Sequence, residues 1–240
     1  MLPEPGPVDG RPGLEEIYFV PEGRHLRVNF VSSLDGAVEI EGRSHPLGGP
    51  ADLDAFMSMR AVADVVMVGA GTARTEDYGP VKLTAEARAR RTERGQSSGA
   101  PLAVVTRHGD LAAGRRFFEG DLIILTTDEV AADPPWGESG AQVIAAGSGR
   151  VDLTTAVREL QDRGYERILC EGGPSLTAGL MAAGLIDEIC VTISPIVAGE
   201  GHRRLSEVNL EAPTHLDLVG LIEADGMLIA RYRVKARPDR

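Results

Sequence analysis

Residues 63–74 read ADVVMVGAGTAR, a nearly continuous apolar run that ends in two closely spaced glycines. Such a run predicts a short strand over residues 63–68 that is covered on both faces, as strands of parallel sheets usually are. Glycines after a strand let the backbone approach a ligand closely, and exposed amides at a strand-to-helix junction bind phosphate. Gly69, Gly71 and Thr72 are therefore candidate anion-binding residues, with a tight crossover turn as the alternative.

Residues 167–177 read RILCEGGPSLT and repeat this arrangement. A predicted strand over residues 167–170 is followed by Gly172 and Gly173, and Pro174 stands where a helix start tolerates a missing N–H group. Ser175 and Thr177 add hydroxyl donors. Two such junctions in one sheet can contact one elongated phosphate ligand at the carboxyl ends of the strands. Together the two stretches predict a dinucleotide site.

Further apolar runs and helical patterns alternate along the chain. They predict strands over residues 26–31, 102–106, 122–126 and 189–193, and helices over residues 83–96, 154–163 and 174–183, with another helix that begins at Pro50. Near the C-terminus, residues 216–223 and 227–234 flank Asp225-Gly226, which favours a tight antiparallel hairpin. The pattern predicts an α/β fold with a mostly parallel central sheet and helices on both faces.

The chain is expected to divide into an N-terminal arm over residues 1–24 and a single domain over residues 25–240. The first 13 residues contain four prolines and three glycines, which is typical of a loose segment. After them the strand and helix patterns follow one another without a linker or a repeat.

The composition limits the function classes. The 240 residues include 36 acidic and 25 basic side chains, a formal net charge of −11, whereas nucleic acids and anionic membranes prefer basic surfaces. No apolar stretch reaches the roughly 18 residues of a membrane span, and the acidic N-terminus does not resemble a signal peptide. The five histidines and two cysteines show no metal-ligand spacing. We therefore expect a cytoplasmic protein with no metal site and a small-molecule ligand.

Arg107 follows the strand predicted over residues 102–106. A strand-end arginine near the hydroxyls of Thr106 and Thr126 can hold a ribose 2′-phosphate, which would select NADP(H) over NAD(H). A solvated loop arginine is the alternative.

The helix that begins at Pro50 carries two further candidates. Asp52 lies in its first turn, where a carboxylate either satisfies the helix dipole or receives an amidine-like edge of a heterocycle. Arg60, two turns later, either holds a phosphate or carboxylate tail or forms a surface ion pair with Asp64.

Taken in order, these motifs resemble the riboflavin-biosynthesis pyrimidine reductases, the reductase part of bifunctional deaminase–reductases, which share the dihydrofolate reductase fold. The resemblance covers roughly residues 25–235 and rests on residues 33–36, 63–72, 171–176, 184–188 and 194–199. It implies NADPH as the hydride donor. The residues that it places at the cofactor are Gly69, Gly71, Thr72, Arg107, Gly172, Gly173, Pro174, Ser175, Leu176 and Thr177.

The resemblance also implies the substrate and the reaction. Members of this family reduce the ribosylamino group of 5-amino-6-(5-phosphoribosylamino)uracil to a ribitylamino group, and a homodimer is expected. The strand over residues 189–193 or the C-terminal hairpin could supply the apolar face of a dimer. The candidate substrate-binding residues are Asn29, Ser44, Asp52, Arg60, Glu76, Asp77 and Glu171, of which Asp52 and Glu171 are the candidate catalytic acids.

Asp52 departs from the family pattern, because bifunctional members generally carry a small or uncharged residue there. Dihydrofolate reductases place a carboxylate on the corresponding helix, where it binds the pteridine. A dihydrofolate reductase-like activity in the same site therefore stays open as an alternative to the pyrimidine reductase. A non-catalytic NADP-binding module is a second alternative, because a fold does not guarantee a chemistry.

Overall fold

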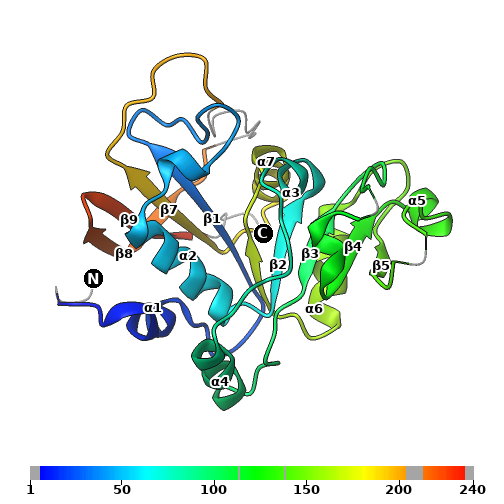
Figure 1. The fold of residues 1–240 in the computed structure, drawn as a ribbon, viewed down its shortest axis with the longest axis horizontal. Helices are drawn as coiled ribbons and strands as arrows, with labels where there is room; N and C mark the ends of the chain where they lie inside the picture. Colours follow the sequence, from blue (N-terminus) through cyan, green and yellow to red (C-terminus); the bar gives the residue numbers. More distant parts are fainter. Residues whose placement is uncertain (1–5, 113, 138, 204–212, 236–240) are drawn as a thin grey trace.

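One nine-stranded sheet runs through the part of the chain that the computed structural model describes, residues 6–112, 114–137, 139–203 and 213–235 (Figure 1). Its strands are β1 (His25–Ser33), β2 (Val65–Gly69), β3 (Leu102–Val105), β4 (Leu122–Thr126), β5 (Gln142–Ala145), β6 (Arg167–Cys170), β7 (Glu188–Ser194), β8 (Leu216–Ala224) and β9 (Met227–Val234). They lie in the order β5-β4-β3-β2-β6-β1-β7-β9-β8, parallel from β5 to β7 and antiparallel from β7 to β8. The predicted α/β fold with its C-terminal antiparallel hairpin is confirmed.

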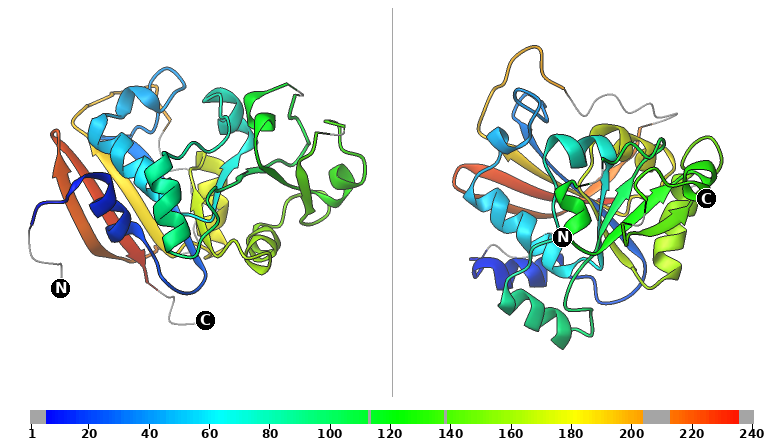
Figure 2. Two further views of the ribbon diagram at one scale, coloured as in Figure 1. Left: turned by 60° about the horizontal axis from the view of Figure 1, so that its bottom comes forward. Right: turned by 45° about the vertical axis from the view of Figure 1, so that its right-hand side comes forward.

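Helices cover both faces of this sheet. Those described are α1 (Gly10–Tyr18), α2 (Pro50–Val62), α3 (Ala70–Thr75), α4 (Ala85–Glu93), α5 (Asp128–Ala132), α6 (Leu153–Asp162) and α7 (Pro174–Ala182), with 3₁₀ turns at His45–Leu47 and Arg116–Glu119. Both views of Figure 2 show α1, α2 and α4 grouped on one side of the molecule. The hydrophobic clusters place α6 and α7 on the opposite face from α1 and α2.

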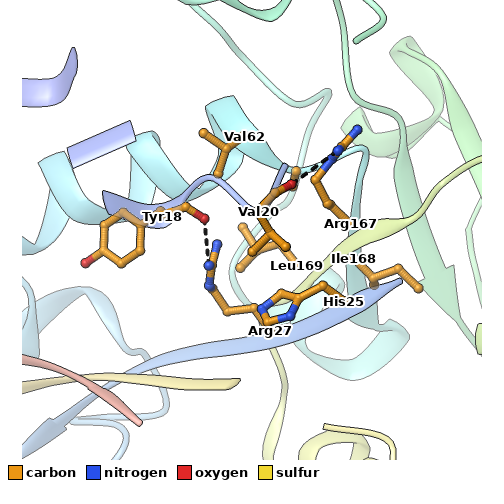
Figure 3. A pocket seen from close by; sticks show the side chains of 9 residues that line it. Tyr18, Val20, His25, Arg27, Val62, Arg167, Ile168 and Leu169 are labelled. Carbon is orange, nitrogen blue, oxygen red and sulfur yellow. Dashed lines mark hydrogen bonds between the residues drawn. The ribbon is translucent and has the colours of Figure 1, made fainter. Parts of the chain in front are cut away.

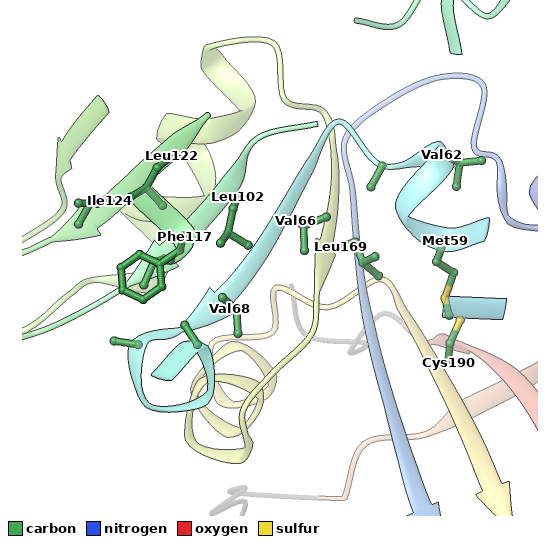
Figure 4. Close-up of a cluster of buried hydrophobic side chains, with 14 of the residues drawn as sticks. Met59, Val62, Val66, Val68, Leu102, Phe117, Leu122, Ile124, Leu169 and Cys190 are labelled. Carbon is green, nitrogen blue, oxygen red and sulfur yellow. The ribbon is translucent and has the colours of Figure 1, made fainter. Parts of the chain in front are cut away.

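The apolar runs are buried from two sides, as their lack of alternation predicts. On one face, Val62 of α2 belongs to the same cluster as Val66 of β2 and Leu169 of β6 (Figure 4). On the other face, Leu160 of α6 and Leu180 of α7 share a second cluster. Since burying an aliphatic side chain contributes about 1.5–3 kcal/mol, these two layers hold the strand ends in fixed positions.

The C-terminal hairpin turns at the two residues expected. Asp225 and Gly226 have φ angles of +53° and +75°, the left-handed conformations that a two-residue turn between twisted strands requires.

The predicted loose segment over residues 1–13 is wrong for residues 10–13, which belong to α1. Leu14 and Tyr18, one helical turn apart, are buried, and α1 packs against α2. Arg27 of β1 donates to the Tyr18 carbonyl oxygen at 2.7 Å. The surrounding prolines and glycines hid this short apolar stripe from the sequence pattern. The boundary at residue 24 stays a prediction.

The edge elements β5 and α5 were also not predicted. In β5, Gln142 and Ala145 are exposed at the edge of the sheet, so no continuous apolar run marks the strand. Helix α5 has five residues and no buried side chain, and its start is capped by Thr127, whose hydroxyl accepts from the Val130 amide. Edge elements of this kind lack the periodicity that identifies buried ones.

A small cavity lies where the end of α1 meets β1 and β6 (Figure 3). Its volume of about 10 Å³ leaves room for about one water molecule. His25 lines it, and its buried Nε2 has no hydrogen-bond partner among the described residues; burial lowers the pKa of this imidazole. The cavity is at the amino end of β1, the opposite end from the predicted site.

Candidate active site

The two glycine-containing turns lie side by side. The first turn (residues 69–72) follows β2 and the second turn (residues 171–174) follows β6, which is the parallel neighbour of β2. The Gly69 amide donates to the Gly172 carbonyl oxygen at 2.8 Å. A Cβ atom on Gly173 would lie 2.2 Å from Oγ1 of Thr72, far inside contact distance, so a larger residue at this position requires the Thr72 side chain or the turn to move. The predicted pairing of the two turns is therefore present in the fold.

The turns also lie where the chain reverses its direction of travel through the sheet. From β2 the chain continues to β3 on one side, and from β6 it passes through α7 to β7 on the other side of β1. In open α/β sheets, ligands bind outside the carboxyl ends of the strands at such a switch point. Backbone without side chains at this point can accept an extended anionic ligand, so the residues present are suited to a dinucleotide.

Arg107 lies along the same edge of the sheet. Gly69 of β2 is level with Val105 of β3, and Arg107 follows two residues later. Its exposed side chain donates from Nε to the Gly149 carbonyl oxygen at 2.8 Å. This places Arg107 two strands away from Gly173, and its contact with a ligand stays a prediction.

The remaining cofactor candidates form the first turn of α7. Pro174 is the first helical residue, as predicted, and Gly173 is the N-cap. Ser175 is exposed, whereas Leu176 and Thr177 are buried beneath the turn. Ser175 is therefore available to a ligand, and the two buried side chains support the backbone.

Glu171 is fully engaged by two side chains from other elements. Arg60 of α2 donates from Nε to Oε1 at 2.7 Å and from Nη2 to Oε2 at 2.8 Å, and the Tyr78 hydroxyl donates to Oε2 at 2.7 Å. The Glu171 side chain is only 2% exposed and that of Arg60 14%. The alternative pairing of Arg60 with Asp64 is wrong, because Asp64 pairs with Arg167 instead.

The contacts among Glu171, Arg60 and Tyr78 favour a charged Arg60 and a neutral Tyr78. Burial alone would lower the pKa of Arg60, but the Glu171 carboxylate outweighs it and raises that pKa. Burial, and then the charge of Glu171, raise the pKa of Tyr78 well above its ordinary value of 10. Tyr78 therefore remains a phenol that donates to a carboxylate, and the guanidinium of Arg60 stays charged above the Phe56 ring at 4.1 Å.

Asp52 lies in the first turn of α2, as predicted, and points toward β7. Thr192 of β7 is its neighbouring polar side chain. Burial raises the pKa of Asp52, and the Thr192 hydroxyl offsets part of this shift. Because α2 connects the parallel strands β1 and β2, its N-terminus lies at their carboxyl ends, the edge that holds the glycine turns.

The other substrate-side candidates are only partly brought together. The Ser44 amide donates to Oε1 of Glu76 at 2.8 Å, which joins these two segments. Asp77 is paired with Arg116 at 3.1 Å, with both side chains about half exposed. Asn29 is buried in β1, level with Cys190 of β7. Contacts of these residues with a substrate stay predictions.

Comparison with known proteins decides the family. Residues 24–228 match the family model described as the RibD C-terminal domain. The chain belongs to this family.

Relatives and solved structures agree with this assignment. A protein of Archaeoglobus fulgidus named 2,5-diamino-6-ribosylamino-4(3H)-pyrimidinone 5′-phosphate reductase is 28% identical over 179 residues, covering 73% of this chain and 82% of the relative. A pyrimidine reductase-like protein of Corynebacterium diphtheriae has a TM-score of 0.83 at 24% identity, over 93% of this chain and 99% of that structure. Dihydrofolate reductase of Enterococcus faecalis, complexed with NADP(H), has a TM-score of 0.53 at 14% identity over 91% and 99%. This RibD C-terminal domain thus has a dihydrofolate reductase-like fold.

Two residues of this RibD C-terminal domain were missed in the sequence, Tyr78 and Thr192. Tyr78 directly follows Glu76 and Asp77, two candidate substrate-binding residues. A polar aromatic side chain next to them could have been predicted to belong to the site. Thr192 belongs to a strand whose period of two places it on the same face as Glu188 and Cys190, but this period does not tell which helix covers that face.

Other features of the described residues lie away from this edge of the sheet. Within them, no group of three His, Cys, Asp or Glu side chains could hold a metal ion, and no helix is long and apolar enough to cross a membrane. A cavity of about 480 Å³ is present at the amino ends of the strands, lined by Asp64, Gln96, Asp121 and Arg167 among others. No residue of either glycine turn lines it.

Proposed function

We propose that this chain is an NADPH-dependent reductase of riboflavin biosynthesis that reduces the ribosylamino group of a phosphorylated aminopyrimidine to a ribitylamino group. The direct contact between the two glycine turns carries the proposal, because it supplies one continuous backbone surface for a dinucleotide. The names of the relatives support the substrate class. A cytoplasmic location is part of this proposal.

The cofactor would lie across the carboxyl ends of β6, β2 and β3. Gly69, Gly71 and Thr72 would contact it from the first turn, and Gly172 to Thr177 from the second. Arg107 would hold its 2′-phosphate, which is the feature that favours NADPH over NADH. When bound, NADPH supplies a hydride, and the remaining tasks fall to the protein.

Those tasks are to orient the sugar and to donate one proton to the nitrogen. In the proposed reaction the sugar ring opens to an imine, C1′ receives the hydride, and the nitrogen receives a proton, so that the substrate gains two electrons and two hydrogens. Asp52, whose pKa is raised by burial, is the better candidate for the proton donor. Glu171 already accepts from Arg60 and Tyr78, so we assign it to positioning the second turn.

The test is NADPH oxidation, followed by absorbance, with 5-amino-6-(5-phosphoribosylamino)uracil and with its 2,5-diamino-pyrimidinone counterpart. The proposal expects turnover with at least one of the two. Tight NADPH binding without oxidation of either would support a non-catalytic NADP-binding module instead.

A dihydrofolate reductase-like activity is the second candidate, and the Asp52–Thr192 contact favours it. A half-buried carboxylate can receive the amino group and ring nitrogen of a pteridine. NADPH oxidation with dihydrofolate tests this activity. It fails if antifolate binding is undetectable or is unchanged by Asp52→Ala.

A homodimer is also proposed, and the C-terminal hairpin supplies the apolar face. Leu218, Leu221 and Leu228 of β8 and β9 are exposed, with Leu221 at 52%. Strand β8 is the edge of the sheet, and apolar edges of this kind commonly mark interaction surfaces. Sedimentation of the wild type and of Leu221→Asp tests this, because the charge should shift the mass toward the monomer.

A further inference from the structure

Helix α1 lies outside the part of the chain that the family model matches, yet it packs against a helix of the candidate site. The match covers residues 24–228, whereas α1 ends at Tyr18. Among the described helices, α1 has the most extensive contact with α2, and Figure 2 shows the two on the same side of the molecule. An element that precedes the family domain therefore supports a helix that carries site residues.

Helix α1 contacts α2 on the side that faces away from the site residues. Asp52 and Arg60 are two helical turns apart and lie on one side of α2. Asp54 and Ser58 each lie two residues from one of them, or about 200° around the helix axis. Arg11 of α1 donates from Nε to Oδ1 of Asp54 at 2.7 Å, and its carbonyl oxygen accepts from the Ser58 hydroxyl at 3.5 Å. Helix α1 thus holds α2 from behind.

A buried carboxylate fixes α1 in this position. Glu15 is only 1% exposed. It accepts from Nε and Nη2 of Arg90 at 2.8 and 2.6 Å, and from Nη1 of Arg94 at 3.0 Å. Arg90 belongs to α4 and Arg94 is its C-cap, so Glu15 attaches α1 to a third helix. Hydrogen bonds between charged groups are stronger than neutral ones, and three of them meet at this one side chain.

Guanidinium groups also hold the C-terminal end of α1. Arg27 of β1 donates to the Tyr18 carbonyl oxygen at 2.7 Å, and Arg231 of β9 donates to that of Ile17. Positive charge at a helix C-terminus is favourable. A helix of nine residues is marginal in water on its own, so its contacts with α4, β1 and β9 determine how firmly it is docked.

The two halves of α2 depend on α1 to different extents. At the C-terminal end of α2, Arg91 and Gln96 donate to the carbonyl oxygens of residues 61–63. These contacts hold the half that carries Arg60 independently of α1. The ion pair from α1 is instead to the first half, which carries Asp52. A loosened α1 therefore displaces Asp52 more than Arg60.

We propose that Glu15 is a positioning residue: by attaching α1 to α4, it holds the first half of α2, and with it Asp52, in the place that the reaction requires. The inference rests on the proposed reductase function and gives a role in it to a segment outside the family domain. Glu15 acts only through α1 and α2. Such a role matters because a misplacement of about 1 Å can cost about a hundredfold in rate.

The experiment compares Glu15→Gln with the matched control Glu16→Gln in the full chain. Both variants remove one negative charge from α1, but Glu16 is exposed. Glu15→Gln should lower kcat/KM about tenfold or more and change the calorimetric Kd for NADPH by less than about twofold. Glu16→Gln should change neither value.

A second control separates positioning from a general loss of stability. Leu160→Ala removes a buried side chain of α6 on the opposite face of the sheet, so it should lower the urea midpoint of unfolding. Under conditions in which the variant is folded, its kcat/KM should equal that of the wild type.

Two further measurements follow the route from Glu15 to Asp52. In an Asp52→Asn background, Glu15→Gln should cause little further loss of kcat/KM, because both changes act through the same group. Amide hydrogen exchange over residues 53–57 should be faster in Glu15→Gln than in the wild type, whereas exchange over residues 171–177 should stay the same. The exchange measurement needs no substrate.

Each outcome decides the matter. The inference is overturned if Glu15→Gln leaves kcat/KM or the exchange of α2 unchanged, if Leu160→Ala lowers kcat/KM as much, or if the losses from Glu15→Gln and Asp52→Asn add in full. If the wild type reduces neither aminopyrimidine, the proposed function fails, and hydrogen exchange still tests whether Glu15 holds α2. Should Glu15→Gln not fold, Arg11→Ala, which removes a partly exposed ion pair, should cause a smaller change of the same kind, and no change in it would overturn the inference.

Discussion

The guanidinium of Arg60 and the carboxylate of Glu171 form a two-pronged ion pair, with Nε–Oε1 at 2.7 Å and Nη2–Oε2 at 2.8 Å. This pair joins residues 111 positions apart in the sequence and ties α2 directly to the turn that follows β6. The helix that carries Asp52 and the backbone proposed to hold the cofactor are therefore connected by a buried contact.

Removing Arg60 should destabilise the protein strongly. Arg60→Ala leaves Glu171 as a buried charge with only the Tyr78 hydroxyl, and breaking a buried pair on one side typically costs about 3–5 kcal/mol. Urea unfolding measures the loss. Arg163→Ala, which removes an exposed pair with Glu159 on α6, is the control and should cost about 1 kcal/mol or less. Equal losses in the two variants would contradict a special role for the buried pair.

Tyr78→Phe should weaken NADPH binding without unfolding the protein. The ring stays in its packing, but Glu171 loses one of its donors and the second glycine turn loses a restraint. Because hydrogen bonds to charged groups are worth about 1.5–3 kcal/mol, we expect the Kd for NADPH to rise about tenfold, measured by calorimetry. The effect should disappear in a Glu171→Gln background. Tyr165→Phe, on the opposite face of the sheet, should leave the Kd unchanged.

How much of this site the sequence could predict depends on how far apart the partners lie. The glycine turns were predictable because each is a local signal at a strand end, and adjacent parallel strands bring their carboxyl ends together. The partner of Arg60 was not predictable, because Glu171 becomes its neighbour only when β6 pairs with β2 in the folded sheet. A local rule favoured Asp64, four residues away, and the tertiary contact overrode it. Thr192 was missed for the same reason, because its role depends on where α2 crosses the sheet.

Gly173→Ala should abolish or strongly reduce NADPH binding. The added methyl group would lie 2.2 Å from Thr72 Oγ1, so the Thr72 side chain must rotate away or the two turns must separate, and either change disturbs the surface proposed for the cofactor. Calorimetry with NADPH should show at least about a tenfold loss of affinity, a change of about 1.4 kcal/mol. Gly99→Ala is the matched control, since its methyl group would have an ordinary contact of 3.7 Å with Arg88. Unchanged affinity in Gly173→Ala would show that the contact between the turns is irrelevant to the cofactor.

Glu188 should make the fold sensitive to acid. It accepts from Arg27 at 2.5 Å and from Arg231 at 2.7 Å, and Arg27 in turn holds the last carbonyl of α1. Burial opposes ionisation of this carboxyl, but the charges of the two arginines outweigh it and lower its pKa from 4.5 to about 2. A lowered pKa in the folded state means that the stabilisation is complete above the unfolded value and is lost as the pH falls through the folded one.

Comparing the wild type with Glu188→Gln isolates this contribution. A pKa difference of about 2.5 corresponds to about 3 kcal/mol at neutral pH. The difference in unfolding free energy between the two proteins should therefore be constant above about pH 5 and should shrink as the pH falls from 4.5 toward 2. Urea unfolding at a series of pH values measures it, with Glu159→Gln on the exposed surface of α6 as the control. A difference that persists undiminished to about pH 2.5 would mean that the charge of Glu188 does not hold α1 to the sheet.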